Sequence, residues 1–552
     1  QIRMGGRVAG RAQPVMSWRR PGPVSGLGLG LAAGLLLLAL ASIGALIGAA
    51  GSGYGTASHT TGYIRHVAGF AFFQASLSAL LSLALALPVA RACWRRASKW
   101  NANLLILFAF LPVVMPTTVA ATGLIGVWGQ RGIMSQLLQS TGGPPLPPVY
   151  GLGAVLLAHV FFNAPLMLRV LSSTLGGIPQ AQWRLAAQWG LSDLERFAKI
   201  EWPTLKRVIP GLLALVFLLC FTSFSLVLML GGGPAVTTLE VSIYTALRFD
   251  FDLPMAGKLA LLQLMICAGV VILLTMLTGR SWPGAAGKTG QTVPQRGDNA
   301  LSTRITDGVI LAIFVCVTVL PLFAILWRGI SPKLAAVLAW PAFWQATFTS
   351  LSIAVLSGLL ATGIALVLAS ARSRRAVASL AVWPLDLAIS LYLAVSAIVL
   401  GTGMFILLRT VADVFLLAPL LVLLGNMLVS LPFAYRILEG RLASLASTQD
   451  RLCAALDIRG WRRFSLVTLP ALAPEIGYAA GLSSALSLGD MTIVALFGSQ
   501  QFQTLPWLLY QTMARYRAGE AAALALLLLC LTLLLFTLFV LSAKLAGRRN
   551  YA

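Results

Sequence analysis

The hexapeptide Ala-Ala-Gly-Lys-Thr-Gly at residues 285–290 ends in the way that a phosphate-binding loop ends. Such a loop needs Gly-x4-Gly-Lys-Ser/Thr, because its backbone N–H groups surround the phosphates and a helix N-terminus follows. With Gly287 as the second glycine, the first would stand at the position of Trp282. The residues that follow include Gln, Pro and Gly, which do not begin a helix. The chain is therefore predicted to have no ATPase site of its own.

Other residue types that carry chemistry are few and scattered. The only histidines are His59, His66 and His159, and neither a cluster of carboxylates nor a nucleophile motif accompanies them. The cysteines show no CxxC spacing and lie mostly in apolar stretches, as small buried residues do. They are Cys93, Cys220, Cys267, Cys316, Cys453 and Cys530. The sequence thus predicts no catalytic residue, no enzymatic activity, no metal site and no cofactor in this chain.

The elements that must position any polar residue here are membrane spans. Of the 552 residues, 58% are hydrophobic and only 10% are charged, and the mean hydropathy is +0.87. Apolar runs of about 20 residues recur, each long enough to cross about 30 Å of hydrocarbon as a helix. They are predicted at 25–50, 69–90, 102–126, 151–171, 208–230, 257–278, 306–327, 346–370, 377–402, 414–435, 473–496 and 520–542. The predicted fold class is an all-α polytopic membrane protein with twelve transmembrane helices.

The net charge of +24 is explained by membrane topology. If both termini lie on one side, 31 of the 40 Lys and Arg residues fall in connections on that side and nine on the other. Because basic residues favour the cytoplasm, both termini are predicted to be cytoplasmic. The expected neighbours of the positive charge are anionic lipid head groups, and no nucleic-acid partner is expected.

The chain contains one unit twice. Residues 159–205 align without a gap with residues 426–472, and 12 of these 47 positions are identical. Six spans in each repeat, an even number, give the repeats the same orientation about an axis along the membrane normal. The predicted domains are a basic cytoplasmic N-terminus (1–24), a first repeat (25–278), a cytoplasmic linker (279–305), a second repeat (306–543) and a cytoplasmic tail (544–552).

The most polar duplicated piece is the cytoplasmic connection between spans 4 and 5 of each repeat, about 35 residues long where a hairpin needs only a few. Its first copy places Leu185 and Trp189 on one face of a short helix that ends at a sharp break. Ala186 and Ala187 allow another surface to approach closely. Two interpretations remain open on composition: an amphipathic helix at the lipid interface, or a helix that docks into a groove on a cytoplasmic partner.

This connection resembles the "EAA" loop of ABC importer permeases, Glu-Ala-Ala-x3-Gly-x9-Ile-x-Leu-Pro. The matching residues are Ala186, Gly190, Ile200 and Pro203 in the first repeat and Val467, Leu469 and Pro470 in the second. Arg184 and Arg451 stand where the family has Glu, and Asp457 replaces the glycine. In that family the loop forms a coupling helix that sits in a cleft of the ATP-hydrolysing subunit. The resemblance implies two copies of a cytoplasmic ABC ATPase, which bind the ATP and Mg²⁺. It assigns coupling to Arg184, Leu185, Ala186, Ala187, Gly190, Arg451, Leu452, Cys453, Ala454 and Asp457, with Pro203 and Pro470 as the loop-end prolines.

Two further stretches, residues 220–252 and 486–517, resemble the permease of thiamine ABC importers. This resemblance implies thiamine as the substrate, a periplasmic substrate-binding protein as a partner, and the bacterial inner membrane as the location. Fused ferric-iron permeases share the architecture and the loops, so a ferric-iron importer stays as the alternative. A proton-coupled carrier also has six-plus-six repeats, but it leaves the duplicated loops unexplained.

Polar residues inside the spans are candidates for the substrate pathway, because burying charge in a membrane is costly. Asp490, whose repeat equivalent is Ser223, would attract a cation such as thiamine, or else bond a neighbouring helix. Asp386 would line the path or satisfy backbone groups that a kink after Pro384 leaves free.

Three other polar residues have structural expectations. His159 and Asn426 occupy equivalent positions in the two repeats and are expected to bond between helices. Glu240 is expected in an outer loop, either solvated or in contact with the binding protein.

Overall fold

The structure, a computed structural model, describes residues 23–52, 57–96, 111–147, 149–278, 300–374, 383–458, 460–499 and 502–549. Within these ranges the chain is helical and contains no β-strand. The Gly-Lys-Thr motif of the linker lies outside the described residues. The predicted all-α membrane fold is confirmed.

The helices follow the two predicted repeats in order. The first repeat contains α1 (Pro23–Gly51), α2 (Ala57–Arg96), α4 (Leu111–Val114), α5 (Thr117–Trp128), α6 (Ile133–Ser140), α7 (Leu152–Gly176), α8 (Gln180–Gln188), α9 (Asp193–Arg196), η1 (Phe197–Glu201), α10 (Trp202–Leu205), α11 (Ile209–Phe221), α12 (Phe224–Leu230), η2 (Pro234–Val236), α13 (Leu239–Arg248) and α14 (Leu253–Thr278). The second contains α15 (Leu301–Gly329), α16 (Pro332–Leu338), α17 (Pro341–Arg374), α18 (Trp383–Ala394), α19 (Ala397–Leu408), α20 (Ala418–Ala455), α21 (Gly460–Arg463), η5 (Phe464–Thr468), α22 (Leu469–Gly489), α23 (Thr492–Phe497), α24 (Leu505–Ala514) and α25 (Ala518–Arg549).

Membrane-length helices account for ten of the twelve predicted spans. In the described part of the chain, eight single helices are long and apolar enough to cross a membrane, and two bent pairs raise the number to ten. The bent pairs are residues 193–221, with a bend of 62°, and residues 384–408, with a bend of 101°. Of the two other predicted spans, 102–126 lies partly outside the described residues, and 473–496 forms α22 and α23. Several spans are thus broken helices rather than straight ones.

The duplication seen in the sequence is present in the backbone. The α9 and α21 helices start and end at positions 267 residues apart, and so do the π-helices η1 and η5. The α13 and α24 helices correspond at a spacing of 266 residues along their whole length. The boundaries of the domains remain a prediction, but these three pairs of elements correspond residue by residue.

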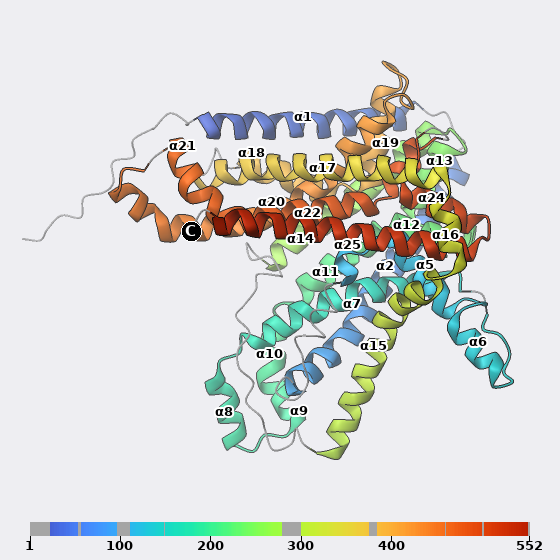
Figure 1. Cartoon of the computed structure of the whole chain (residues 1–552), viewed down its shortest axis with the longest axis horizontal. Coiled ribbons are helices and arrows are strands. Elements are labelled where there is room, and N and C mark those ends of the chain that lie inside the picture. Colours follow the sequence, from blue (N-terminus) through green and yellow to red (C-terminus); the bar gives the residue numbers. More distant parts are fainter. Residues whose placement is uncertain are drawn as a thin grey trace, which may run out of the picture.

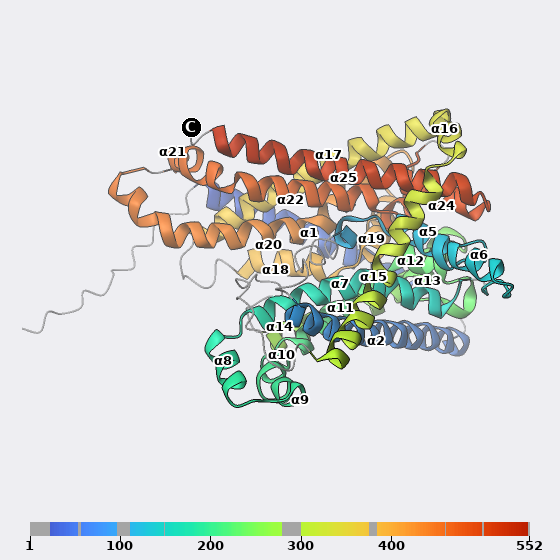
Figure 2. The same ribbon diagram turned by 60° about the horizontal axis from the view of Figure 1, so that its bottom comes forward.

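The first helix of each repeat packs against the other repeat. The α1 helix contacts α17 and α19, whereas α15 contacts α2 and α5. Figure 1 shows blue α1 beside the yellow-to-red helices of the second repeat. In the same view, yellow-green α15 crosses the blue and teal helices of the first repeat, and Figure 2 shows α15 beside α2 and α5. This exchange is reciprocal, as expected for two repeats related by an axis between them.

Glycines at equivalent positions permit this exchange. A Cβ atom on Gly123 of α5 would lie 2.7 Å from the carbonyl oxygen of Pro321 in α15. A Cβ atom on Gly403 of α19 would lie 2.9 Å from the carbonyl oxygen of Ser42 in α1. Small residues let membrane helices approach closely, and here they do so at the two matching contacts between repeats.

Candidate coupling surface and translocation pathway

The first coupling segment, defined as residues 177–208, begins with a short helix that a glycine ends. Gly190 follows α8 with a φ of +63°, in the left-handed region that favours glycine. The Leu191 N–H donates to the Ala186 carbonyl at 3.1 Å, and the Gly190 N–H donates to the Ala187 carbonyl at 3.2 Å. These two bonds form a Schellman motif, which satisfies carbonyls at the helix end. The sharp break predicted at this position is present.

The second coupling segment, defined as residues 444–475, has a similar helix end, but its helix is not a separate one. Helix α20 continues without interruption to Ala455, so the counterpart of α8 is an extension of the preceding span. Asp457 has a φ of +51°, and the Ile458 N–H donates to the Cys453 carbonyl at 2.9 Å. Asp visits the left-handed region more readily than most residues because its short polar side chain can bond locally. The replacement of glycine by Asp457 therefore preserves the helix end.

Large apolar side chains are exposed at matching positions of the two coupling segments. Leu185 is 44% exposed and Leu452 is 61% exposed. One turn further on, Trp189 is 70% exposed and Leu456 is 61% exposed. Leu452 lies at the end of α20, and in both Figure 1 and Figure 2 that orange end and α8 lie toward the left of the molecule. We call Leu185 and Trp189 the first coupling face, and Leu452 and Leu456 the second.

The opposite side of each helix is buried. Ala186 and Cys453, at equivalent positions, are 1% and 4% exposed. Trp183 of α8 packs on Trp94 of α2, with ring centroids 5.6 Å apart. Ala186 therefore faces the protein, whereas Arg184, Leu185 and Ala187 are exposed. The side chains of Arg451 and Ala454 lie outside the described residues.

Each coupling segment continues into a π-helix and a proline. Helices η1 and η5 precede Pro203 and Pro470, which lie in the first turns of α10 and α22. A proline is tolerated there because its missing N–H would have had no partner within the helix. Pro470 lies at the start of the long helix α22, whereas Pro203 lies in the single turn α10, and the longer helix α11 begins at Ile209.

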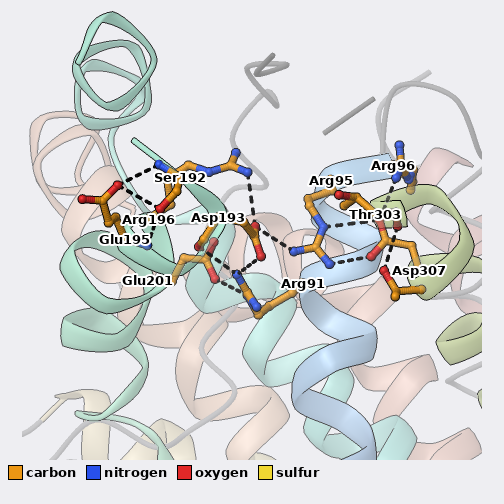
Figure 3. Close-up of polar contacts among 11 residues, drawn as sticks. Arg91, Arg95, Arg96, Ser192, Asp193, Glu195, Arg196, Glu201, Thr303 and Asp307 are labelled. Atoms are coloured by element: carbon orange, nitrogen blue, oxygen red, sulfur yellow. Dashed lines mark hydrogen bonds and ion pairs between the residues drawn. The ribbon is translucent and has the colours of Figure 1, made fainter. Parts of the chain in front are cut away.

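Charged residues connect the first coupling segment to α2 (Figure 3). The Arg91 Nε atom lies 2.6 Å from Glu201 Oε2, and its Nη2 lies 3.2 Å from Asp193 Oδ2. The Arg91 guanidinium also stacks over the Phe197 ring at 4.6 Å. Ser192 and Glu195 form a capping box at the start of α9. The segment is therefore held to α2 by ion pairs and by a cation–π contact.

The same arginine-rich end of α2 also contacts the second repeat (Figure 3). The Arg95 Nη1 atom lies 3.1 Å from Asp193 Oδ1, while its Nη2 lies 2.5 Å from Asp307 Oδ1. Arg96 approaches the other Asp307 oxygen at 3.0 Å. Asp307 is 1% exposed and belongs to α15. The first coupling segment thus contacts α2 directly, and Arg95 of α2 joins Asp193 of the segment to Asp307 of α15.

Ion pairs in the second repeat join different elements. The Arg372 Nε atom of α17 lies 2.7 Å from Asp386 Oδ1 of α18, and its Nη1 lies 2.6 Å from Glu439 Oε1 of α20. Arg441 of α20 lies 3.2 Å from Glu475 of α22. The structure thus places Asp386 in an ion pair at the start of α18, and its role in the substrate pathway stays a prediction.

Asp490 and Ser223 lie where the fifth span of each repeat is broken. Ser223 separates α11 from α12, and Asp490 separates α22 from α23. The Asp490 carboxylate accepts hydrogen bonds from the Thr492 and Ile493 N–H groups, each at 3.1 Å, and so caps α23. A Cβ atom on neighbouring Gly489 would lie 3.0 Å from Pro116 Cα of the first repeat. Asp490 therefore sits in a helix break beside the contact between the repeats.

The expected bonds between helices are confirmed for both equivalent polar residues. His159 Nδ1 of α7 lies 2.7 Å from Gln74 Nε2 of α2. Asn426 Nδ2 of α20 donates to Ser487 Oγ of α22 at 2.9 Å. Both residues thus stabilise packing within their own repeat.

The expectation for Glu240 is wrong. Glu240 is fully buried, because α13 folds back into the protein instead of forming an exposed loop. The sequence contained a signal for this burial: Leu239, Ile243 and Leu247 recur every four residues, and all are at most 3% exposed. That spacing is typical of an amphipathic helix with one buried face.

Membrane-length helices in two parallel repeats, with broken spans and polar residues where the repeats meet, define a polytopic transport protein. Known proteins similar to this chain are transport permeases. The thiamine transport system permease protein ThiP of Escherichia coli (strain K12) is 41% identical over 488 residues, covering 88% of this chain and 90% of that protein. The chain belongs to the family of thiamine transport system permease proteins.

Two other members extend the similarity over nearly the whole length. The ThiP protein of Salmonella typhimurium (strain LT2) is 39% identical over 544 residues, covering 98% of this chain and 99% of that protein. The ThiP protein of Brucella abortus (strain 2308) is 39% identical over 521 residues, covering 93% and 94%. Comparison with models of known protein families found no match.

Proposed function

We propose that this chain is the permease of an ABC importer for thiamine in the bacterial inner membrane. Hydrolysis of ATP takes place on two copies of a separate ATPase, and a periplasmic binding protein delivers the substrate. The thiamine assignment is supported by the names of relatives that match most of the chain. Both termini face the cytoplasm, because the connections on their side carry most of the basic residues.

The observation that carries the coupling proposal is the duplicated exposure of Leu185, Leu452, Trp189 and Leu456. Apolar side chains grouped on a polar loop outside the spans mark a surface for a partner. Two such faces at equivalent positions fit two copies of one partner, one for each repeat. The helices behind them connect directly to the spans, so movement of the partner reaches the pathway.

The mechanism that follows is alternating access. ATP binding draws the two ATPases together, and the two coupling faces move with them. The repeats then rotate about their common axis and open the pathway to the outside, where the binding protein releases its substrate. Hydrolysis reverses the movement.

Capture of the ATPase by the purified permease tests this proposal. Leu185→Asp and Leu452→Asp each place a charge on a coupling face, and each is expected to weaken ATPase binding at least about tenfold, since one buried leucine contributes about 1.5–3 kcal/mol. Leu416→Asp is the matched control, because Leu416 is 81% exposed but lies in the connection after α19, away from the coupling segments. Binding of the ATPase by the double variant with wild-type affinity would contradict the coupling role.

Reconstitution into liposomes tests the substrate and the energy source. The complete complex is expected to show ATPase activity that thiamine with its binding protein stimulates and that ferric iron does not. The permease alone is expected to concentrate no thiamine in the absence of nucleotide. Stimulation by ferric iron would instead support the alternative importer, and uptake by the permease alone on a proton gradient would support a carrier.

A further inference from the structure

A buried polar cluster joins the two repeats away from the coupling segments. Gln263 of α14 donates from Nε2 to Glu240 Oε1 at 2.5 Å and to Ser396 Oγ at 3.2 Å. Glu240 and Gln263 belong to the first repeat, and Ser396 caps α19 in the second. Glu240 and Gln263 are fully buried, and Ser396 is 7% exposed. The cluster thus combines a carboxylate, an amide and a hydroxyl from both sides of the contact between the repeats.

Two oxygen atoms of this cluster have no hydrogen-bond partner among the residues that the structure describes. They are Glu240 Oε2 and Gln263 Oε1. A buried polar atom without a partner is destabilising, and a buried charge without a counter-charge is more so. Such atoms are rare in native proteins and point to a group that binds there.

A second carboxylate belongs to an element that packs against this cluster. Asp490 caps α23, and α23 contacts both α13, which carries Glu240, and α19, which Ser396 caps. Neither carboxylate forms an ion pair with a Lys or Arg in the described part of the chain. The hydrogen bonds by which Asp490 caps α23 fix the orientation of the Asp490 carboxylate, but they do not supply a positive charge. No Lys or Arg in the described part of the chain is therefore placed to neutralise either carboxylate when it is ionised.

The cluster lies deep within the membrane-spanning region. Gln263 is ten residues into α14, about 15 Å along the helix from its start at Leu253. Ser396 follows the twelve residues of α18, which extend about 18 Å from the opposite side. These distances place both residues near the middle of a hydrocarbon layer about 30 Å thick. Substrate sites of transporters with internal repeats commonly lie at this depth, where broken helices of the repeats meet.

We propose that Glu240 and Asp490 form the cation-recognition site of the translocation pathway, with Gln263 and Ser396 holding Glu240 in place. This inference rests on the proposed thiamine function, because the thiazolium ring of thiamine carries a permanent positive charge. The site takes one carboxylate from each repeat, so rotation of the repeats separates the two and releases the ligand.

Direct binding of radiolabelled thiamine to the permease–ATPase complex in nanodiscs, without the binding protein, tests the inference. Glu240→Gln retains a carbonyl oxygen for the Gln263 hydrogen bond, removes the charge and replaces the other oxygen by a neutral NH2 group. It is expected to weaken thiamine binding at least about tenfold, as is Asp490→Asn, because each removes one partner of a desolvated charge pair. Glu240→Asp, which retains the charge, is expected to recover part of the affinity. Asp413→Asn is the control, since Asp413 is exposed in the connection between α19 and α20.

The possible outcomes separate this inference from the proposed function. If the wild-type complex neither binds nor transports thiamine, the thiamine function is wrong. If the wild type binds thiamine and Glu240→Gln binds it equally well, only the cation site is wrong, because a merely structural glutamate would tolerate this change. If the Glu240→Gln complex does not assemble, a binding measurement on the wild-type complex tests the inference instead. Equal affinity of the wild type for thiamine and for an uncharged, ring-reduced analogue would overturn it.

Discussion

The ends of the two coupling helices allow a sharp prediction. Gly190 and Asp457 occupy equivalent positions with φ values of +63° and +51°. A Cβ atom on Gly190 would meet no atom within 4 Å, so Gly190→Ala adds backbone strain and no collision. Gly190→Asn is the matched variant, because Asn adopts this conformation at lower cost. Asp457→Gly is the reverse experiment in the second repeat.

The free-energy change expected for Gly190→Ala follows from the backbone conformation of this residue. A left-handed φ costs a residue with a Cβ about 1–2 kcal/mol, and replacing glycine recovers about 0.4–1 kcal/mol through the unfolded chain. The net effect of Gly190→Ala is thus a loss of about 1 kcal/mol at this helix end, a factor of about five in the local opening equilibrium. Gly190→Asn is expected to have a smaller effect, and Asp457→Gly a stabilising effect at its own helix end.

Amide hydrogen exchange of the assembled complex measures this equilibrium at the Schellman bonds. The Leu191 amide is expected to exchange about five times faster in Gly190→Ala, and the Ile458 amide more slowly in Asp457→Gly. Both report the bonds to the Ala186 and Cys453 carbonyls. Unchanged exchange at Leu191, or faster exchange at Ile458 in Asp457→Gly, would refute the assignment of these two residues as equivalent left-handed caps.

Two further substitutions, Asp307→Asn and Gly489→Ala, test contacts between the repeats, and each is compared with a milder substitution elsewhere. Asp307→Asn removes the buried carboxylate between Arg95 and Arg96 and is expected to lower the free energy of unfolding by about 3 kcal/mol. Asp193→Asn, at a side chain that is 43% exposed, should cost about 1 kcal/mol or less in the same denaturant titration; equal losses would contradict this ranking. Gly489→Ala places a methyl group 3.0 Å from Pro116 and should lower the thermal midpoint of the permease, whereas Gly363→Ala, where a Cβ meets no atom within 4 Å, should not. Identical midpoints for the two alanine variants would show that this contact tolerates displacement.

Much of the fold could be predicted from the sequence, because membrane spans are specified by hydropathy over long windows. The breaks within those spans could not be predicted in the same way. The bend between α18 and α19 falls at Val395 and Ser396, neither of which breaks a helix by its own preference. A break within a membrane is tolerated when the surrounding protein satisfies the freed backbone groups. Here Ser396 does so through its own side chain, which accepts a hydrogen bond from the Val399 N–H.

The candidate site, like the fold, could be predicted from the sequence only in part. The helix ends at Gly190 and Asp457 could be located because the surrounding pattern occurs twice in the sequence, whereas the coupling role of these helices stays a prediction. Glu240 could not be placed, because its helix of ten residues is too short for a span and lies in what hydropathy reads as a connection. The spacing of Leu239, Ile243 and Leu247 indicates a helix with a buried face, but it does not identify the neighbours of Glu240. Those neighbours, Gln263 and Ser396, are 23 and 156 residues away in the sequence.

The two coupling segments differ in the contacts that connect them to the spans. In the first repeat, the coupling segment contacts Arg91 and Arg95, and through Arg95 it reaches Asp307 of the opposite repeat. In the second repeat, the equivalent of Glu201 is Thr468, which carries no charge to make the corresponding pair. Its coupling helix is instead a rigid continuation of α20. Under the proposed coupling role, force enters the first repeat through partly buried ion pairs and the second mainly through an unbroken helix. The Arg441–Glu475 pair of the second repeat is more exposed than the pairs of Arg91 and Arg95, so a higher salt concentration should weaken it more than those of the first repeat.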